Sequence, residues 1–322
     1  MQHFQDAPQV LRDFLSYHEN IKGQSENTIS EYYLDLRMFL RFMKRARTGG
    51  TDKTPLEEID IRDVDLDFLR DITTSDVYDF LSWLAHDRQK RPGAPDSEPG
   101  IDNAARARKL NAIKSFYKYL TARTRQLEEN PVADMEYPKL RKSLPRYLTL
   151  DQCQALLSAV EGRHRQRDFA ILMIFLNCGV RVSELVGLNL SDIYDDRLRV
   201  LGKGNKERTV AITDKTAAHL SRYISQFHSD ESDKDSYLFY TVIKHKVDHI
   251  STGTVERILQ KYADEARATC PDMPKKVYPH LLRAERATHL YRDGVDPIMI
   301  SKILGHAQLE TTKIYALPSI DQ

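Results

Sequence analysis

The sequence lacks the features that would place a protein of this size among membrane, disulfide-stabilised or secreted proteins. Its 322 residues include three cysteines, Cys153, Cys178 and Cys270, and no CxxC pair. The cysteines therefore provide neither a disulfide framework nor a zinc site, and they suit a reducing compartment. No apolar run reaches the roughly 18 residues that cross a membrane, and the N-terminus lacks the basic start and apolar core of a signal peptide. We expect a cytoplasmic protein.

Two common catalytic signatures are also missing. The run Gly202-Lys203-Gly204 is no Walker A loop, because the required spacing and the following Ser or Thr are absent. There is no HExxH sequence either. We expect neither a metal nor another cofactor.

Charge is nearly balanced overall but unevenly distributed. The formal net charge is +1. Residues 48–87 hold eleven Asp or Glu against three Lys or Arg, whereas residues 104–146 hold eleven Lys or Arg against four Asp or Glu. This asymmetry suggests one face for phosphate and another turned away from it, although solvated helix surface explains any single charge about as well.

The N-terminal part predicts a helical unit. Helices are expected at about 8–20, 25–47, 74–88 and 102–127, with an acidic connection at 51–72. In the last of these helices Leu110, Ile113, Tyr117 and Leu120 are expected to pack inward. Its basic residues are free to face outward, namely Arg106, Arg108, Lys109, Lys114 and Lys118, and the first four are candidate DNA contacts. A basic linker follows, with Arg141, Lys142 and Arg146 close together, and Arg141 and Lys142 are further candidates unless the segment is an ordinary exposed connection.

The rest of the chain predicts a second, mostly helical unit. It starts with a capping box from Thr149 to Gln152. Helices are expected at about 151–160, 166–178, 214–228 and 252–268, the second of them apolar on all sides and central. Between them, alternating Leu198 and Val200, a turn at 202–206 and a return strand at 209–212 indicate a β-hairpin.

The segment 279–315 contains most of the residues whose side chains could take part in catalysis. His280 and Arg283 are three apart, so a helix places both on one face. Gly294 suits the end of that helix, Asp296-Pro297 suits the start of the next, and Gly305 suits its end. His306 then lies in the turn, and a last short helix carries Tyr315.

Together with Arg181 and Lys203, these residues fit the cleavage of a phosphodiester. Arg181 and Arg283 can clamp the non-bridging oxygens, where charge builds. His280 and His306 can donate hydrogen bonds or move a proton, and Tyr315 offers a phenolic nucleophile. Lys203 can protonate the leaving oxygen, with Lys206 of the same loop as its competitor. Glu184, one turn after Arg181, can orient that arginine.

The ordered set resembles the tyrosine recombinase (integrase) family, and most closely its Xer-type members. The matching positions are Arg181 in GVRVSEL, Lys203 in LGKGNKER, His280 and Arg283 in HLLR, His306 in LGHA, and Tyr315. The resemblance implies a 3′-phosphotyrosyl intermediate and favours Lys203 over Lys206. Two departures stand out: Glu285 adds a charge after the HxxR arginine, and seven residues follow Tyr315, fewer than the C-terminal helix that Xer-type relatives dock onto a neighbouring protomer.

The resemblance also implies an architecture and partners. We expect a mainly α protein with a small β-hairpin, in which two domains form a C-shaped clamp around DNA. Residues 1–135 would form a helical core-binding domain, 136–148 a basic linker and 149–322 the catalytic domain. The partner would be double-stranded DNA with inverted-repeat sites, on which the protein assembles into a tetramer when two sites are paired.

Two other functions share part of this pattern. A type IB topoisomerase uses the same chemistry without a partner strand, although the small helical N-terminal unit favours a recombinase. A helix-turn-helix regulator explains the turn at Gly294. It leaves Arg181, Lys203, His280 and Tyr315 unexplained.

Overall fold

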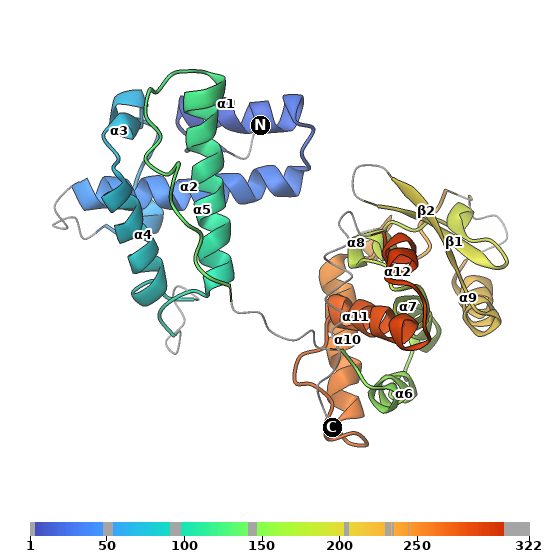
Figure 1. The fold of residues 1–322 in the computed structure, drawn as a ribbon. Coiled ribbons are helices and arrows are strands. Elements are labelled where there is room, and N and C mark those ends of the chain that lie inside the picture. Colours follow the sequence, from blue (N-terminus) through green and yellow to red (C-terminus); the bar gives the residue numbers. More distant parts are fainter. Residues whose placement is uncertain are drawn as a thin grey trace. The chain divides into compact units, whose positions relative to one another are not determined.

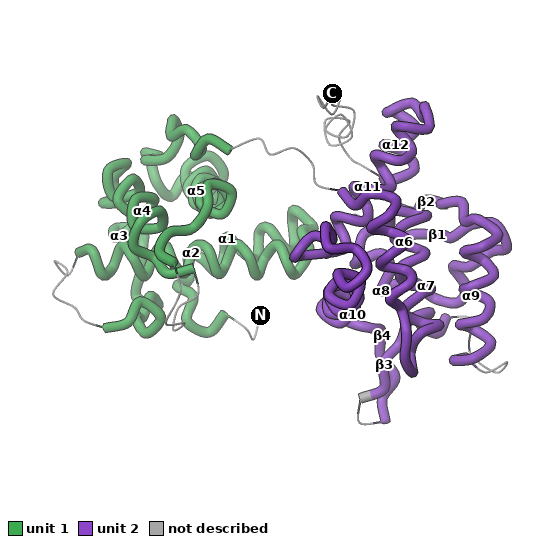
Figure 2. Tube along the Cα trace, turned by 90° about the horizontal axis from the view of Figure 1, so that it is seen from below, with its two compact units in different colours: residues 1–142 green, residues 143–322 purple. Residues whose placement is uncertain are grey.

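The computed structural model describes residues 4–47, 54–90, 98–140, 147–202, 206–228, 233, 235–243 and 245–305 (Figure 1). Most of these residues are helical, and their strands form two separate two-stranded antiparallel sheets. The expected class, mainly α with a small β component, is confirmed. The chain divides into two compact units, residues 1–142 and 143–322, coloured separately in Figure 2. None of the helices in the described ranges combines the length and apolar character that a bilayer crossing requires.

The first unit is a bundle around three helices. These are α2 (Glu26–Arg47), α4 (Thr74–His86) and α5 (Asn103–Lys118), joined by α1 (Gln9–Ser16) and the short α3 (Leu66–Arg70). Turns of π-helix extend α1 and α5, at Tyr17–Ile21 and Tyr119–Arg123. The four residues expected to face inward from the basic helix, Leu110, Ile113, Tyr117 and Leu120, are fully buried, which confirms that prediction.

The acidic connection is more ordered than the sequence indicated. Within 54–72 the chain forms a 3₁₀ turn at Leu56–Glu58 and then α3. The side chain of Asp65 caps α3 by accepting the backbone N–H of Phe68 at 2.8 Å. The apolar residues between the acids are buried in the bundle, so the negative charges lie on its surface.

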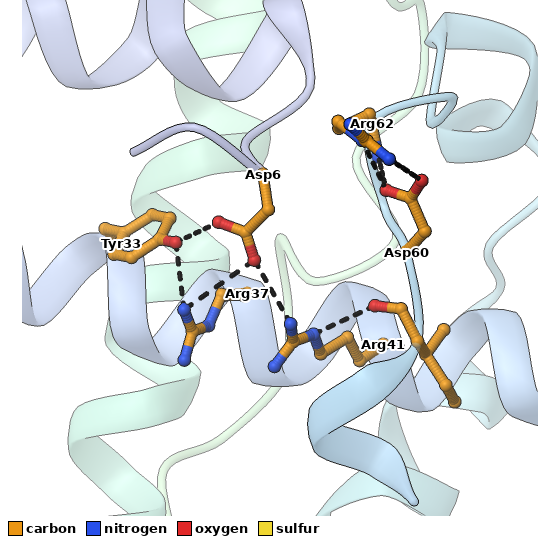
Figure 3. Close-up of polar contacts among 7 residues, drawn as sticks. Asp6, Tyr33, Arg37, Arg41, Asp60 and Arg62 are labelled. Carbon is orange, nitrogen blue, oxygen red and sulfur yellow. Dashed lines mark hydrogen bonds and ion pairs between the residues drawn. The ribbon is translucent and has the colours of Figure 1, made fainter. Parts of the chain in front are cut away.

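A polar network fastens the start of the chain to α2 (Figure 3). The carboxylate of Asp6 accepts a hydrogen bond from the Tyr33 hydroxyl and pairs with Arg41 at 3.1 Å and Arg37 at 3.6 Å. Arg41 also donates from Nε to the carbonyl of Ile59 at 3.0 Å. Side chains of α2 therefore bind both the segment before α1, at Asp6, and the connection after α2, at Ile59.

The second unit packs its helices around α7 (Arg165–Cys178). Residues 170–175 of α7 are all buried, as the uniformly apolar sequence predicted, and the helix contacts α9 (Asp214–Phe227) and α11 (Pro279–Arg292). The other helices are α6 (Leu150–Ser158), α8 (Val182–Val186), a 3₁₀ turn Leu190–Asp192, α10 (Thr252–Ala266) and α12 (Pro297–Leu304). The predicted capping box is present at the start of α6, between Thr149 and Gln152.

Two hairpins complete this unit. Strands β1 (Arg197–Leu201) and β2 (Glu207–Ala211) pair with Leu198 opposite Val210 and Val200 opposite Arg208, which confirms the expected hairpin. Strands β3 (Tyr240–Ile243) and β4 (Lys246–His249) form a second hairpin that the sequence analysis did not predict. Figure 2 shows it extending away from the helices of its unit, and each residue of β4 is exposed.

The helix boundaries predicted near the end of the chain are confirmed. Gly294 follows α11 with φ +82°, and Gly305 ends α12 with φ +67°. The side chain of Asp296 accepts the backbone N–H of Ile298 at 2.8 Å, with Pro297 at the first position of α12. The helix expected to carry Tyr315 lies outside the described residues.

Candidate active site

Arg181 is presented by a sharp turn at the end of the central helix. Helix α7 stops at Gly179, whose φ of +60° a residue with a side chain rarely adopts. A Cβ at Gly179 would also lie 2.7 Å from Cδ2 of Leu304 in α12. Arg181 follows as the N-cap of α8, and its side chain is 30% exposed. The turn therefore delivers the guanidinium to the point where α7 meets α12.

Glu184 orients Arg181, as the sequence analysis predicted from its place one helical turn later. Its carboxylate accepts the backbone N–H of Arg181 at 2.7 Å and Nη1 of the same residue at 2.8 Å. The Glu184 side chain is almost completely buried, at 2% exposure. A carboxylate held this way fixes both the backbone and the side chain of the arginine.

Arg283 reaches the same place from α11. Its side chain is buried and donates from Nη1 to the carbonyl of Gly179 at 2.5 Å and from Nη2 to that of Leu304 at 2.6 Å. Arg181 donates from Nη2 to the carbonyl of Gly305 at 2.8 Å. The two guanidinium groups therefore bind successive carbonyl oxygens at the C-terminus of α12, where the helix dipole favours positive charge.

His280 lies on the first turn of α11, one turn before Arg283, and its side chain is only partly accessible to solvent. Its pKa is lowered from the ordinary 6.5, first by partial burial and then by the positive charges of Arg283 and Arg181. The imidazole is therefore neutral at pH 7 and able to accept a proton or a hydrogen bond.

Arg208 also belongs to this cluster, and the sequence analysis missed it. It donates from Nη1 and Nη2 to the two carboxylate oxygens of Glu184 at 2.7 and 2.8 Å, and from Nε to the carbonyl of Ile303 at 3.1 Å. The signal was the alternation of β2, which places Arg208 on the same side as buried Val210. A charged residue on the inner face of a strand needs a buried partner of opposite charge.

Lys203, His306 and Tyr315 lie outside the described residues, and so does the short helix expected around Tyr315. The residues directly before the first two are described, however. A Cβ at Gly202 would lie 3.5 Å from Oε1 of Glu184, and one at Gly305 would lie 3.0 Å from Nη1 of Arg208. Gly202 and Gly305, the last described residues before Lys203 and His306, therefore both lie close to the Glu184–Arg208 pair.

The basic residues of α5 differ from one another in their surroundings. Lys109 was expected to face outward, and this is wrong: it is buried and its Nζ binds Asp35 of α2 at 2.6 Å. The core-facing stripe of α5 is wider than predicted, and the buried Asp35 requires a cation. Arg108 is exposed and pairs with Asp35 and Glu31.

Arg106 and Lys114 are half-buried rather than free. Arg106 donates to Asn103 at 2.5 Å, and its Nε is buried with no hydrogen-bond partner among the described atoms. Lys114 donates to the carbonyl of Ala133 at 3.1 Å and lies 5.3 Å from the ring centre of Tyr137. Arg141 and Lys142 of the linker lie outside the described residues.

Several known proteins are similar to this chain over most of its length. Residues 146–320 match the model of the phage integrase family. The chain is 38% identical to "Tyrosine recombinase XerC" of Caldanaerobacter subterraneus subsp. tengcongensis over 96% of its own length and 82% of the relative's. It is 31% identical to "Tyrosine recombinase" of Pseudothermotoga lettingae over 97% of its length and 94% of that relative's.

A solved structure shares the fold. The XerH site-specific recombinase bound to its difH substrate aligns with a TM-score of 0.63 and 21% identity, over 90% of this chain and 76% of that one. At this identity the likeness supports the fold.

Proposed function

This chain belongs to the phage integrase family and is a site-specific tyrosine recombinase, and we propose that it cleaves and rejoins DNA through a 3′-phosphotyrosyl intermediate on Tyr315. One observation carries the proposal. Arg181 and Arg283, from separate parts of the chain, converge on the carbonyls of Gly305 and Leu304, directly before His306. Two guanidinium groups held at this point can receive the two non-bridging oxygens of one phosphate.

The proposed cleavage step conserves the phosphodiester energy. The Tyr315 oxygen attacks the phosphorus, the phenolic proton passes to a neutral histidine, and the bond between phosphorus and the 5′-oxygen breaks. Lys203 gives a proton to that oxygen, which leaves as a hydroxyl. Because the phosphotyrosyl bond replaces the one that is lost, the 5′-hydroxyl of a partner strand can reverse the step without a nucleotide cofactor.

The charged residues of the site have separable roles in this step. Arg181 and Arg283 stabilise the charge that builds on the phosphate. His280, neutral because its pKa is lowered, is suited to receive the phenolic proton, with His306 as a hydrogen-bond donor to the phosphate. Glu184 keeps Arg181 in place.

We propose duplex DNA with inverted-repeat sites as the partner, and assembly into a tetramer when two sites are paired. The proposed domains are residues 1–135 for DNA binding, 136–148 as a basic linker and 149–322 for catalysis. Candidate phosphate contacts are Arg106, Arg108, Lys114, Arg141 and Lys142, whereas Lys109 is committed to Asp35. Such a protein would act in the cytoplasm.

The test requires a defined site, which is obtained by selecting duplexes that the protein binds from a random-sequence pool. A nicked duplex carrying this selected site then traps cleavage, because the short strand beside the nick diffuses away. The wild type is expected to form a covalent protein–DNA adduct on a denaturing gel, whereas Tyr315→Phe binds the duplex and forms none. Transfer of the trapped strand to a second duplex separates a recombinase from a topoisomerase, and absence of any adduct would leave a DNA-binding regulator.

A further inference from the structure

The carboxylate of Glu184 is shared between two arginines. It accepts two hydrogen bonds from Arg181, one from the backbone and one from the side chain, and two from the guanidinium of Arg208. The side chains of Glu184 and Arg208 are 2% and 13% exposed. Such a bidentate pair is rigid and shielded from water, unlike the exposed ion pairs elsewhere on the β1–β2 hairpin.

Arg208 lies close to described residues that bind Arg181 or that precede Lys203 and His306. It binds Glu184, and thereby Arg181. Its Nη1 would lie 3.6 Å from a Cβ at Gly202, which precedes Lys203. It also binds the carbonyl of Ile303 and lies next to Gly305, the residue before His306.

The charge balance explains why the second arginine is needed. Burial alone raises the pKa of Glu184, but the hydrogen bonds from Arg208 and from the Arg181 backbone outweigh it and bring the pKa below the ordinary 4.5. Without Arg208 the carboxylate would stay buried with one cation, so its pKa would rise. A protonated Glu184 would hold Arg181 less firmly.

We propose that Arg208 is a positioning residue for strand cleavage, which holds Glu184 against Arg181 and packs close to Gly202 and Gly305, the last described residues before Lys203 and His306. This inference rests on the proposed function. Arg208 does not have to touch the DNA in this role. The β1–β2 hairpin would then contribute to the position of Arg181 through Arg208, in addition to containing Lys203.

The test compares four variants by single-turnover cleavage of the nicked selected site over a range of pH. Arg208→Met is expected to cleave about 10²-fold more slowly, the loss typical of a misplaced reacting group. It should also lose further rate as pH falls, because the raised pKa of Glu184 then comes into range. This additional loss should disappear in the double variant Glu184→Gln/Arg208→Met, in which no carboxylate remains to be protonated.

Two variants serve as controls. Arg199→Met removes another arginine of the same hairpin, paired with Asp192 at 2.8 Å but 41% exposed, and should cleave like the wild type. Arg208→Lys keeps the charge without the bidentate geometry, and should show the slower rate without most of the pH effect. Should Arg208→Met fail to fold, Arg208→Gln, which also removes the charge, is measured in its place with the same expectations.

The comparison of Arg208→Met with the double variant also controls for the other charged groups near the Glu184 carboxylate. Arg181 and Arg208 contact it. Glu256 and Arg257 lie on α10, and Arg197 and Arg199 lie on β1, the two elements that pack against α8. His280 and Arg283 lie on α11, and Lys203 and His306 lie outside the described residues. All of these except Arg208 are retained in both the single and the double variant. A pH effect that persists in the double variant therefore does not come from Glu184.

The outcomes separate this inference from the function on which it rests. If the wild type forms no adduct, the proposed function fails. If the wild type forms it and Arg208→Met cleaves at the same rate, or more slowly with an unchanged pH profile, the positioning role is overturned. Persistence of the pH effect in the double variant would overturn it as well.

Discussion

The guanidinium of Arg181 donates to the carbonyl of Gly305 at 2.8 Å, across 124 positions of the sequence. This bond joins the turn after the central helix α7 to the end of α12. Arg208 also packs close to Gly305, since a Cβ added at Gly305 would lie 3.0 Å from Nη1 of Arg208. Gly305, the last described residue before His306, is therefore close to both arginines.

A methyl group at Gly305 should therefore impair cleavage. Gly305→Ala meets a φ of +67° and places Cβ 3.0 Å from Nη1 of Arg208. Gly294→Ala is a matched control, because it has a φ of +82° and no atom within 4 Å of the added Cβ. Both should lose about 1–2 kcal/mol of stability. Only Gly305→Ala should also slow cleavage, measured at a temperature where both variants are folded, and equal rates for the two would contradict the contact with Arg208.

Cleavage should depend on the protonation of His280. Its pKa is lowered, so the neutral form prevails at pH 7 and the rate should fall only as pH drops through that lowered value, on the acid side of 6.5. His280→Gln should be slower by about 10²–10⁴ and should lack this dependence. His289→Gln, on the exposed side of the same helix, should keep the wild-type profile. An acid limb that survives in His280→Gln would assign the proton acceptor to another group.

The buried ion pair between Lys109 and Asp35 should stabilise the first unit only while both partners are present. Lys109→Met leaves the carboxylate of Asp35 with Arg108 alone, and should cost about 3 kcal/mol, the lower end for breaking a buried pair. Adding Asp35→Asn should recover part of this loss. Trp83 is the single tryptophan and lies in α4, so its fluorescence during urea unfolding reports on this unit. Lys118→Met, at an exposed position of α5, is the control, and a similar loss there would contradict the assignment.

Lys203 should be needed only when the leaving oxygen requires a proton. Replacing the bridging 5′-oxygen by sulfur makes the leaving group a good one, so Lys203→Ala should cleave the sulfur substrate nearly as fast as the wild type. On the ordinary substrate it should be slower by about 10²–10⁴. Lys206→Ala is the control and should show little defect on either substrate. An equal defect of Lys203→Ala on both would make it a phosphate-binding charge.

The sequence predicts best what depends on neighbouring residues. The boundaries of α11 and α12 follow from Gly294, Asp296 and Gly305, each acting on its own turn. The buried face of α5 follows from its apolar spacing. These features need no knowledge of the rest of the fold.

The features that the sequence did not predict depend on residues far away in the chain, or lie in a strand without alternating buried and exposed residues. The sequence around Lys109 is typical of a surface lysine, because its buried partner Asp35 lies 74 positions away. Arg208 likewise acquires its role from Glu184 and from the end of α12. The β3–β4 hairpin lacks a buried stripe in β4, so no alternation marks that strand.

Mapping the covalent bond between protein and DNA identifies the nucleophile. The wild-type adduct with the nicked selected site is digested with a protease and a nuclease, and the modified peptide is sequenced by mass spectrometry. The chain has 16 tyrosines, so the result discriminates strongly. We expect one nucleotide-bearing peptide, modified at Tyr315. A modification at any other tyrosine, or at a residue of another type, would contradict this assignment.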